Sequence, residues 1–198
     1  MWALVEDNTI TKIINNPKAM VIGDTQYSRN IFSFRWSNAE REAIGIYEVV
    51  FDNTKKKDGE YYNNTDQTFT YDADAGTVTA TYGDATAKAH ADANATDDDG
   101  NDLDPVVVIE GLKTKKIRNV KIQAASILTQ TDWYIVRKTD AGTSVPSAIT
   151  NHRAAVRTKC AAMETAITNA SNTPAIETLY TRNADGVRPL GDLPELEV

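Results

Sequence analysis

A change in hydrophobic periodicity part-way along the chain is the feature that most constrains its fold. Up to residue 84, β-prone residues form short runs separated by polar turns, whereas from Leu112 the apolar residues recur at helical spacing. An acidic run, Asp97–Asp102, lies between these regions and contains no apolar anchor. The sequence therefore predicts an α+β protein, with a small N-terminal antiparallel β domain followed by a C-terminal helical hairpin. The expected segments are residues 1–84 for the β-rich domain, 85–111 for an acidic linker or insertion, 112–181 for the helical hairpin and 182–198 for an extended tail.

The N-terminal region is expected to form hairpins and one short helix. Glu6-Asp7-Asn8 is a polar turn between two β-prone runs, and a similar turn precedes Thr77. Ser37 and Glu40 have the spacing of a capping box, so a short helix should begin there and end at Gly45. The predicted strands are residues 1–5, 9–14, 19–22, 46–51, 67–71 and 77–82, together with 30–36, where alternation places Phe32, Phe34 and Trp36 on one face.

The C-terminal region is expected to be helical. A first helix should start at Leu112 and end between residues 132 and 136, and a short last helix should begin at Thr173-Pro174. A long helix should lie between them, over residues 147–170. Its apolar residues form a narrow seam of coiled-coil type, which favours self-association: Ile149, Val156, Cys160, Met163, Ile167 and Ala170.

Charge and composition disfavour several classes of partner. The net charge of −7 opposes non-specific binding to nucleic acid. The apolar runs are short, as in Val106–Ile109 with four residues, whereas a membrane span needs about 20. No basic flank precedes an apolar stretch at the N-terminus, so no signal peptide is expected. The single cysteine, Cys160, excludes an intrachain disulfide and is expected to be a buried, inert thiol.

No constellation of residues indicates catalysis or a cofactor. The chain has no GxSxG, P-loop, GxGxxG or HExxH motif. Its two histidines are His90 and His152, and His152 lies two helical turns, about 12 Å, from Cys160. When Gly100 is placed at the sixth position of a calcium-binding EF-hand loop, both anchoring acids of the loop are missing. We therefore expect a non-enzyme without cofactor, whose acidic run is a solvated loop or, alternatively, a cation site of another type.

The basic stretch Lys113–Lys121 has two interpretations. It lacks the interleaved aromatic residues of a single-strand nucleic-acid site, so it is either a solvated helix face or a docking surface for an acidic partner. The acidic run of a neighbouring copy is one such partner.

The order of motifs after residue 128 resembles a known family. Leu128–Lys138 contains Thr131-Asp132-Trp133 and is followed by Ala141-Gly142, Val145-Pro146 and Arg153–Arg157. This order resembles the C-terminal module of bacteriophage tail-fibre assembly proteins and related small tail proteins, although His152 stands where that family often has an aromatic residue. The N-terminal runs resemble proteins of marine phages: Trp2–Val5, Asn30–Phe32, Trp36-Ser37 and Ile44–Ile46.

The resemblance implies a protein of the phage tail that acts by protein–protein contact. The first hypothesis is a virion adaptor that binds other tail proteins, is present in several copies, and resides in the host cytoplasm during assembly. The alternatives are a tail-fibre assembly chaperone absent from the finished particle and a host-glycan-binding module. Arg153 and Arg157 should face Asp132 and Asp140 across a loop. The expected interaction residues are Phe32, Phe34, Trp36, Trp133, Tyr134, Arg153, Arg157, Leu190, Leu193 and Leu196.

Overall fold

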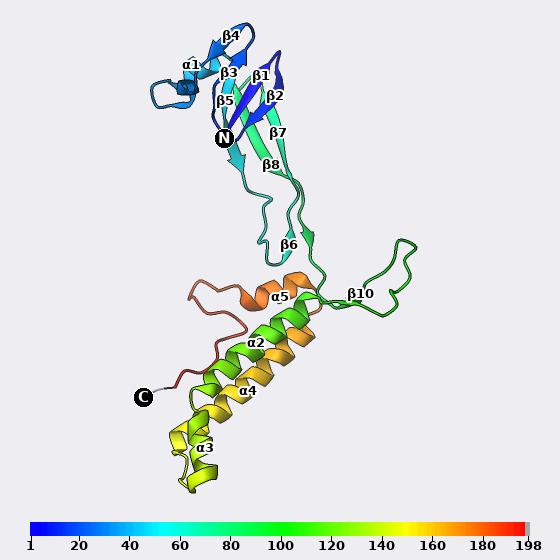
Figure 1. The fold of residues 1–198 in the computed structure, drawn as a ribbon, viewed down its shortest axis with the longest axis vertical. Helices are drawn as coiled ribbons and strands as arrows, with labels where there is room; N and C mark the ends of the chain where they lie inside the picture. Colours follow the sequence, from blue (N-terminus) through cyan, green and yellow to red (C-terminus); the bar gives the residue numbers. More distant parts are fainter. Residues whose placement is uncertain (197–198) are drawn as a thin grey trace. The chain divides into compact units, whose positions relative to one another are not determined.

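The computed structural model of the chain describes residues 1–196, so the last two residues of the predicted tail, 197–198, lie outside the described residues. The chain divides into two compact units, residues 1–86 and 87–198. The first unit contains strands and the second is mainly helical, which confirms the α+β class (Figure 1).

The first unit is built on a five-stranded sheet with the order β2-β1-β5-β8-β7. The β1–β2, β1–β5 and β7–β8 pairs are antiparallel, as predicted, whereas the β5–β8 pair is parallel and the prediction of an antiparallel domain is wrong there. The parallel pairing follows from the order of the strands in the sheet. Because β7 lies at the sheet edge, the β7–β8 hairpin places β8 between β7 and β5. The strands of this sheet are β1 (Trp2–Glu6), β2 (Thr9–Ile14), β5 (Ile46–Asp52), β7 (Gln67–Asp72) and β8 (Thr77–Tyr82).

Both faces of this sheet are covered by apolar side chains. Alternate residues of β1 point to opposite faces, so Ala3 packs with Val49 and Val78 while Leu4 packs with Ile14 and Ile46. The hairpin of β3 (Met20–Ile22) and β4 (Thr25–Tyr27) contributes Met20 and Ile22 to the second cluster.

Local sequence signals explain the turns of this unit. The β1–β2 turn places Asp7 and Asn8 at positive φ, which these two residue types tolerate better than most. The predicted capping box is present, because Ser37 accepts a hydrogen bond from the N–H of Glu40, whose carboxylate accepts one from the N–H of Ser37. It starts α1 (Asn38–Glu42). A side chain at Gly45 would place Cβ 2.5 Å from the carbonyl oxygen of Val5, so the predicted glycine stop is also required by packing.

The predicted strand over residues 30–36 is wrong. Arg29–Phe32 instead forms a 3-10 helix, η1, because the Ser28 hydroxyl accepts from Asn30 and the Ser33 hydroxyl donates to its carbonyl. The three aromatic residues therefore do not share a face. Phe32 packs against Trp2 at a ring separation of 5.9 Å, Trp36 packs edge-on against Tyr27, and Phe34 is 95% exposed.

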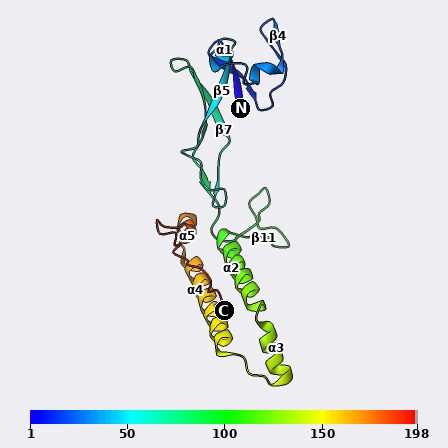
Figure 2. The ribbon, with the colours of Figure 1, turned by 90° about the vertical axis from the view of Figure 1, so that its left-hand side faces the viewer.

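The second unit contains four helices among its described residues, and α2 and α4 pack along one another (Figures 1 and 2). The predicted seam of α4 is buried except at Cys160, which is partly exposed. None of the helices within residues 1–196 is long and apolar enough to cross a membrane. The bounds are α2 (Leu112–Thr129), α3 (Asp132–Ala141), α4 (Ser147–Asn169) and α5 (Thr173–Tyr180), the last capped by Asn172 rather than by Thr173.

The first predicted helix is interrupted at Thr131, so its predicted end within residues 132–136 is wrong. The Thr131 hydroxyl donates to the carbonyl of Leu128, and the Arg153 guanidinium donates to the same carbonyl. These side chains satisfy a carbonyl that a continuing helix would use, and α3 begins as a separate helix.

The segment after α5 returns to the helices instead of remaining free. Leu190 is only 3% exposed and joins a cluster with Val120, Met163 and Ile167, against which Leu193 also packs. The N–H of Leu190 donates to the carbonyl of Leu179 at 2.9 Å. The prediction that Leu190 is available to a partner protein is therefore wrong, because its own unit buries it.

Candidate contact surfaces

A β-hairpin arm, residues 91–111, projects from the second unit beyond the N-terminal end of α2 (Figures 1 and 2). Its two short strands, β10 (Ala93–Asn94) and β11 (Val108–Ile109), are antiparallel. Its tip is the predicted acidic loop, in which the Asp97 carboxylate accepts hydrogen bonds from the N–H groups of Asp99 and Asn101 at 3.0 and 2.9 Å. These bonds lower the pKa of Asp97, with that from Asn101 contributing most.

The base of the arm is joined to the start of α2. Gly111, the N-cap of α2, has no capping side chain, and its N–H donates to the Asp92 carboxylate at 2.8 Å. The Thr114 hydroxyl donates to the second carboxylate oxygen, also at 2.8 Å. A Cβ at Gly111 would lie 2.3 Å from backbone atoms of Ala91, so the two ends of the arm cross in direct contact. The backbone hydrogen bond from Gly111 and then that from Thr114 lower the pKa of Asp92.

The second strand of the arm carries an exposed apolar strip. Val106, Val107, Val108 and Ile109 are 59%, 49%, 55% and 57% exposed. Single exposed apolar residues are ordinary, but consecutive ones mark contact sites or aggregation hazards. Within residues 1–196, β11 pairs with β10 alone, so its other edge also has free backbone groups.

An open, shallow surface of about 550 Å³, named here the α2 groove, lies along the exposed side of α2, and all of its lining residues belong to that one helix. Its lining includes the cationic side chains of Arg118 and Lys121. The side chain of Ile122, which also lines it, is 59% exposed. Arg118 pairs with Glu110 and Lys121 with Glu164, so each cation already has one carboxylate neighbour. Ile117, Ala125 and Thr114 complete the lining.

The aromatic residues of α3 form a second exposed surface. The rings of Trp133 and Tyr134 lie 3.8 Å apart between centroids, and the Arg137 guanidinium lies 4.7 Å from the Trp133 centroid. None of the residues of α3 is fully buried, and Val136 is exposed beside this cluster. The predicted Trp133-Tyr134 pair is therefore on the surface of its unit.

The two predicted arginines of α4 have different environments. Arg153 is buried, lies 2.8 Å from Asp132, and donates to the Thr131 hydroxyl at 2.7 Å. Arg157 is exposed. The structure thus places Arg153 at the start of α3, through Thr131 and Asp132. Phe32, Phe34 and Trp36 belong to the first unit, and Leu196 is half-buried near the end of the described chain.

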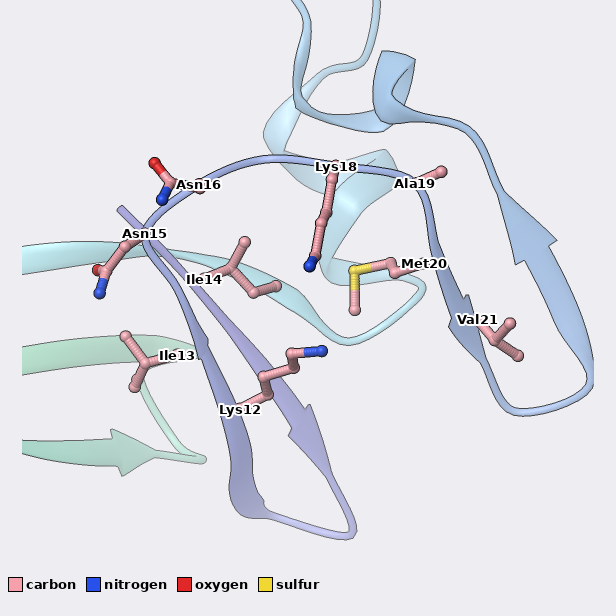
Figure 3. A pocket seen from close by; sticks show the side chains of 9 residues that line it. All are labelled: Lys12, Ile13, Ile14, Asn15, Asn16, Lys18, Ala19, Met20 and Val21. Carbon is pink, nitrogen blue, oxygen red and sulfur yellow. The ribbon is translucent and has the colours of Figure 1, made fainter.

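The first unit has a shallow pocket of about 390 Å³ between β2 and β3. The amino groups of Lys12 and Lys18 point toward the same space beside the Met20 side chain (Figure 3). Such a pocket can hold a small anionic group by charge, but its lining offers no nucleophile paired with a base. The other lining residues are Ile13, Ile14, Asn15, Asn16, Ala19 and Val21.

Cys160, the single thiol of the sequence, lies on α4 beside Glu164. The Cys160 thiol donates to Glu164 at 3.4 Å, and its pKa is raised, first by burial and second by this contact. Within residues 1–196, no group of three or more histidine, cysteine or acidic side chains is placed to hold a metal ion.

The arm was missed as a contact element in the sequence, where residues 85–111 were expected to be an acidic linker or insertion. The signal that could have identified it is the apolar run Val106–Ile109 next to the acidic run, since a solvated linker has no need of four consecutive apolar residues.

Comparisons of the chain with protein-family models, with curated proteins and with solved structures found no match.

Proposed function

We propose that the chain is a structural protein of a bacteriophage tail, which acts by binding other tail proteins rather than by catalysis. The observation that carries the proposal is the arm, whose apolar strip Val106–Ile109 stays exposed in the folded chain. Because exposed apolar surface of this kind is costly in water, covering it with a partner protein is favourable.

Two further features support the proposal. The motif order from Leu128 to Arg157 resembles small phage tail proteins, and α3 carries the Trp133-Tyr134 pair of that motif on an exposed surface. In this proposal α2 and α4 form the helical hairpin expected from the sequence, α3 is its tip, and the tip and the arm are separate docking elements. The protein would reside in the host cytoplasm during assembly and in the virion tail afterwards.

The experiment compares particles produced with the wild-type chain and with Val108→Asp. The variant places a charge in the apolar strip and should be lost from purified particles, as measured by mass spectrometry of the virions. Val187→Asp is the matched control, because Val187 is 57% exposed, close to the 55% of Val108, but lies outside the arm. It should be incorporated like the wild type.

Two outcomes would contradict the proposal. If the wild-type chain is absent from particles but tails fail to assemble without it, the protein is an assembly chaperone. If Val108→Asp is incorporated normally, the arm is not the contact that holds the protein in the particle.

A further inference from the structure

We infer that the arm of one copy docks in the α2 groove of a second copy, which makes a head-to-tail contact between identical chains. This inference rests on the proposed function, because it names the partner of the same arm. The partner is inferred to be a second copy because the arm and the α2 groove have complementary charge and similar length, and because the arm points away from the helix of its own chain.

The arm offers negative charge and apolar surface in sequence order. Five aspartates lie within residues 97–104, and the exposed strip Val106–Ile109 follows directly. A site that binds this segment therefore needs cations beside an apolar floor.

The α2 groove has this composition. Arg118 and Lys121 stand on its rim, and Ile117, Ile122 and Ala125 supply apolar surface. The side chains of Arg118 and Lys121 are 52% and 59% exposed despite their ion pairs. Guanidinium and ammonium groups have several donors, so each can bind a second carboxylate. The two surfaces are thus complementary in charge as well as in hydrophobicity.

The lengths of the two surfaces also agree. The four residues Val106–Ile109 span about 13 Å as an extended strand. The groove runs from Thr114 to Ala125, which corresponds to about 17 Å along a helix. The strip therefore fits along the groove, with the neighbouring aspartates close to the cationic rim.

The arm cannot reach the groove of its own chain without breaking its attachment. Asp92 and Gly111 hold both ends of the arm at the start of α2, and the N–H of Leu112 donates to the carbonyl of Ala89. From there the arm extends away from the body of the helix in both views (Figures 1 and 2). An arm that docks in this groove therefore belongs to another molecule.

A contact between two different surfaces leaves one free arm and one free groove at the ends of every dimer. Such contacts continue into a closed ring or an open filament, depending on the rotation between neighbours. A repeated arrangement of this kind suits a protein that is present in several copies around or along a tail.

The test is the oligomeric state of the purified full-length chain, measured by light scattering after size-exclusion chromatography. Ile122→Glu should inactivate the groove by placing a like charge against the acidic arm, and Val108→Asp should inactivate the arm. Both positions are exposed, so the variants should melt like the wild type at concentrations where the wild type is monomeric. Asn119→Glu, on an exposed part of α2 outside the groove, and Val187→Asp are the controls and should associate like the wild type.

The decisive measurement is a mixture of the two defective variants. Each variant alone should be monomeric, whereas the mixture should form a one-to-one dimer and nothing larger, because one intact arm meets one intact groove. Added salt should weaken both this dimer and the wild-type assembly, since the contact is partly ionic.

Other results would overturn the inference without deciding the proposed function. If Ile122→Glu alone still associates, the contact is arm to arm or lies elsewhere. If the wild type stays monomeric at all concentrations, the partner of the arm is a different protein. Loss of Val108→Asp from particles would in that case still support a role in the tail.

Discussion

The Asp92 carboxylate accepts a hydrogen bond at 2.8 Å from the N–H of Gly111, which lies nineteen residues later and directly before α2. The Thr114 hydroxyl donates to the other oxygen. One side chain therefore joins the base of the arm to the start of α2, whose first N–H groups, on Leu112 and Lys113, donate to the carbonyls of Ala89 and His90. The stability of this junction should depend on the charge of Asp92.

We expect Asp92→Asn to lower the stability of the protein in a pH-dependent manner. The folded state lowers the pKa of Asp92, chiefly through the Gly111 hydrogen bond, so the stabilising contribution is complete above the unfolded pKa and is lost as the pH falls through the folded pKa. The difference in unfolding free energy between wild type and variant should be constant near neutral pH and shrink in acid. Urea unfolding at a series of pH values measures this difference. Asp98→Asn, at the exposed tip of the same arm, should follow the wild-type curve.

A second prediction separates the two arginines of α4. Arg153→Met should lower the free energy of unfolding by about 2 to 3 kcal/mol, because the Leu128 carbonyl and the Asp132 carboxylate lose a charged hydrogen-bond donor. Arg157→Met removes the same charge one turn later from an exposed position and should change stability by less than about 0.5 kcal/mol. Thermal and urea unfolding of the two variants provide the comparison. Equal losses would show that Arg153 has no special role at the α2–α3 junction.

Features that depend on a few adjacent residues could be predicted from the sequence. The Ser37–Glu40 capping box, the turn at Asp7 and the seam of α4 are examples, since propensity and spacing decide them. Side chains that compete for backbone groups were the first source of error. Ser33 turns residues 29–32 into a 3-10 helix, although the alternation of that segment favours a strand.

Contacts between residues far apart in the sequence were the second source of wrong predictions. They determine which residues of most candidate surfaces are exposed and which are covered. The Arg153 contact that helps end α2 joins residues 25 positions apart, and the Asp92–Gly111 hydrogen bond joins residues 19 apart. No local pattern reports such pairs. Trp133 and Tyr134 are consecutive in the sequence, but no local pattern could show that the arm is exposed and that Leu190 is covered.

A third prediction concerns the segment after α5. Leu190→Ala should cost about 2 to 5 kcal/mol, as expected for truncating a buried leucine that packs against Val120, Met163 and Ile167. Val187→Ala, in the same segment but exposed, should change stability by less than about 0.5 kcal/mol. Denaturant unfolding measures both. Wild-type stability of Leu190→Ala would mean that the segment is not part of the helical core, and that it is free for a partner as the sequence first indicated.

The last prediction concerns the reactivity of Cys160. Burial raises the pKa of its thiol first and the contact with Glu164 second, so little thiolate forms near neutral pH and labelling by a thiol reagent should be slow. Glu164→Gln removes the negative charge 3.4 Å from the sulfur while keeping the shape of the side chain. The pH midpoint of the labelling rate should therefore fall toward the usual value for cysteine without reaching it, because burial remains. Glu48→Gln, an exposed change of the same charge in the first unit, should leave the midpoint unchanged. An unaltered midpoint in Glu164→Gln would show that burial alone controls this thiol.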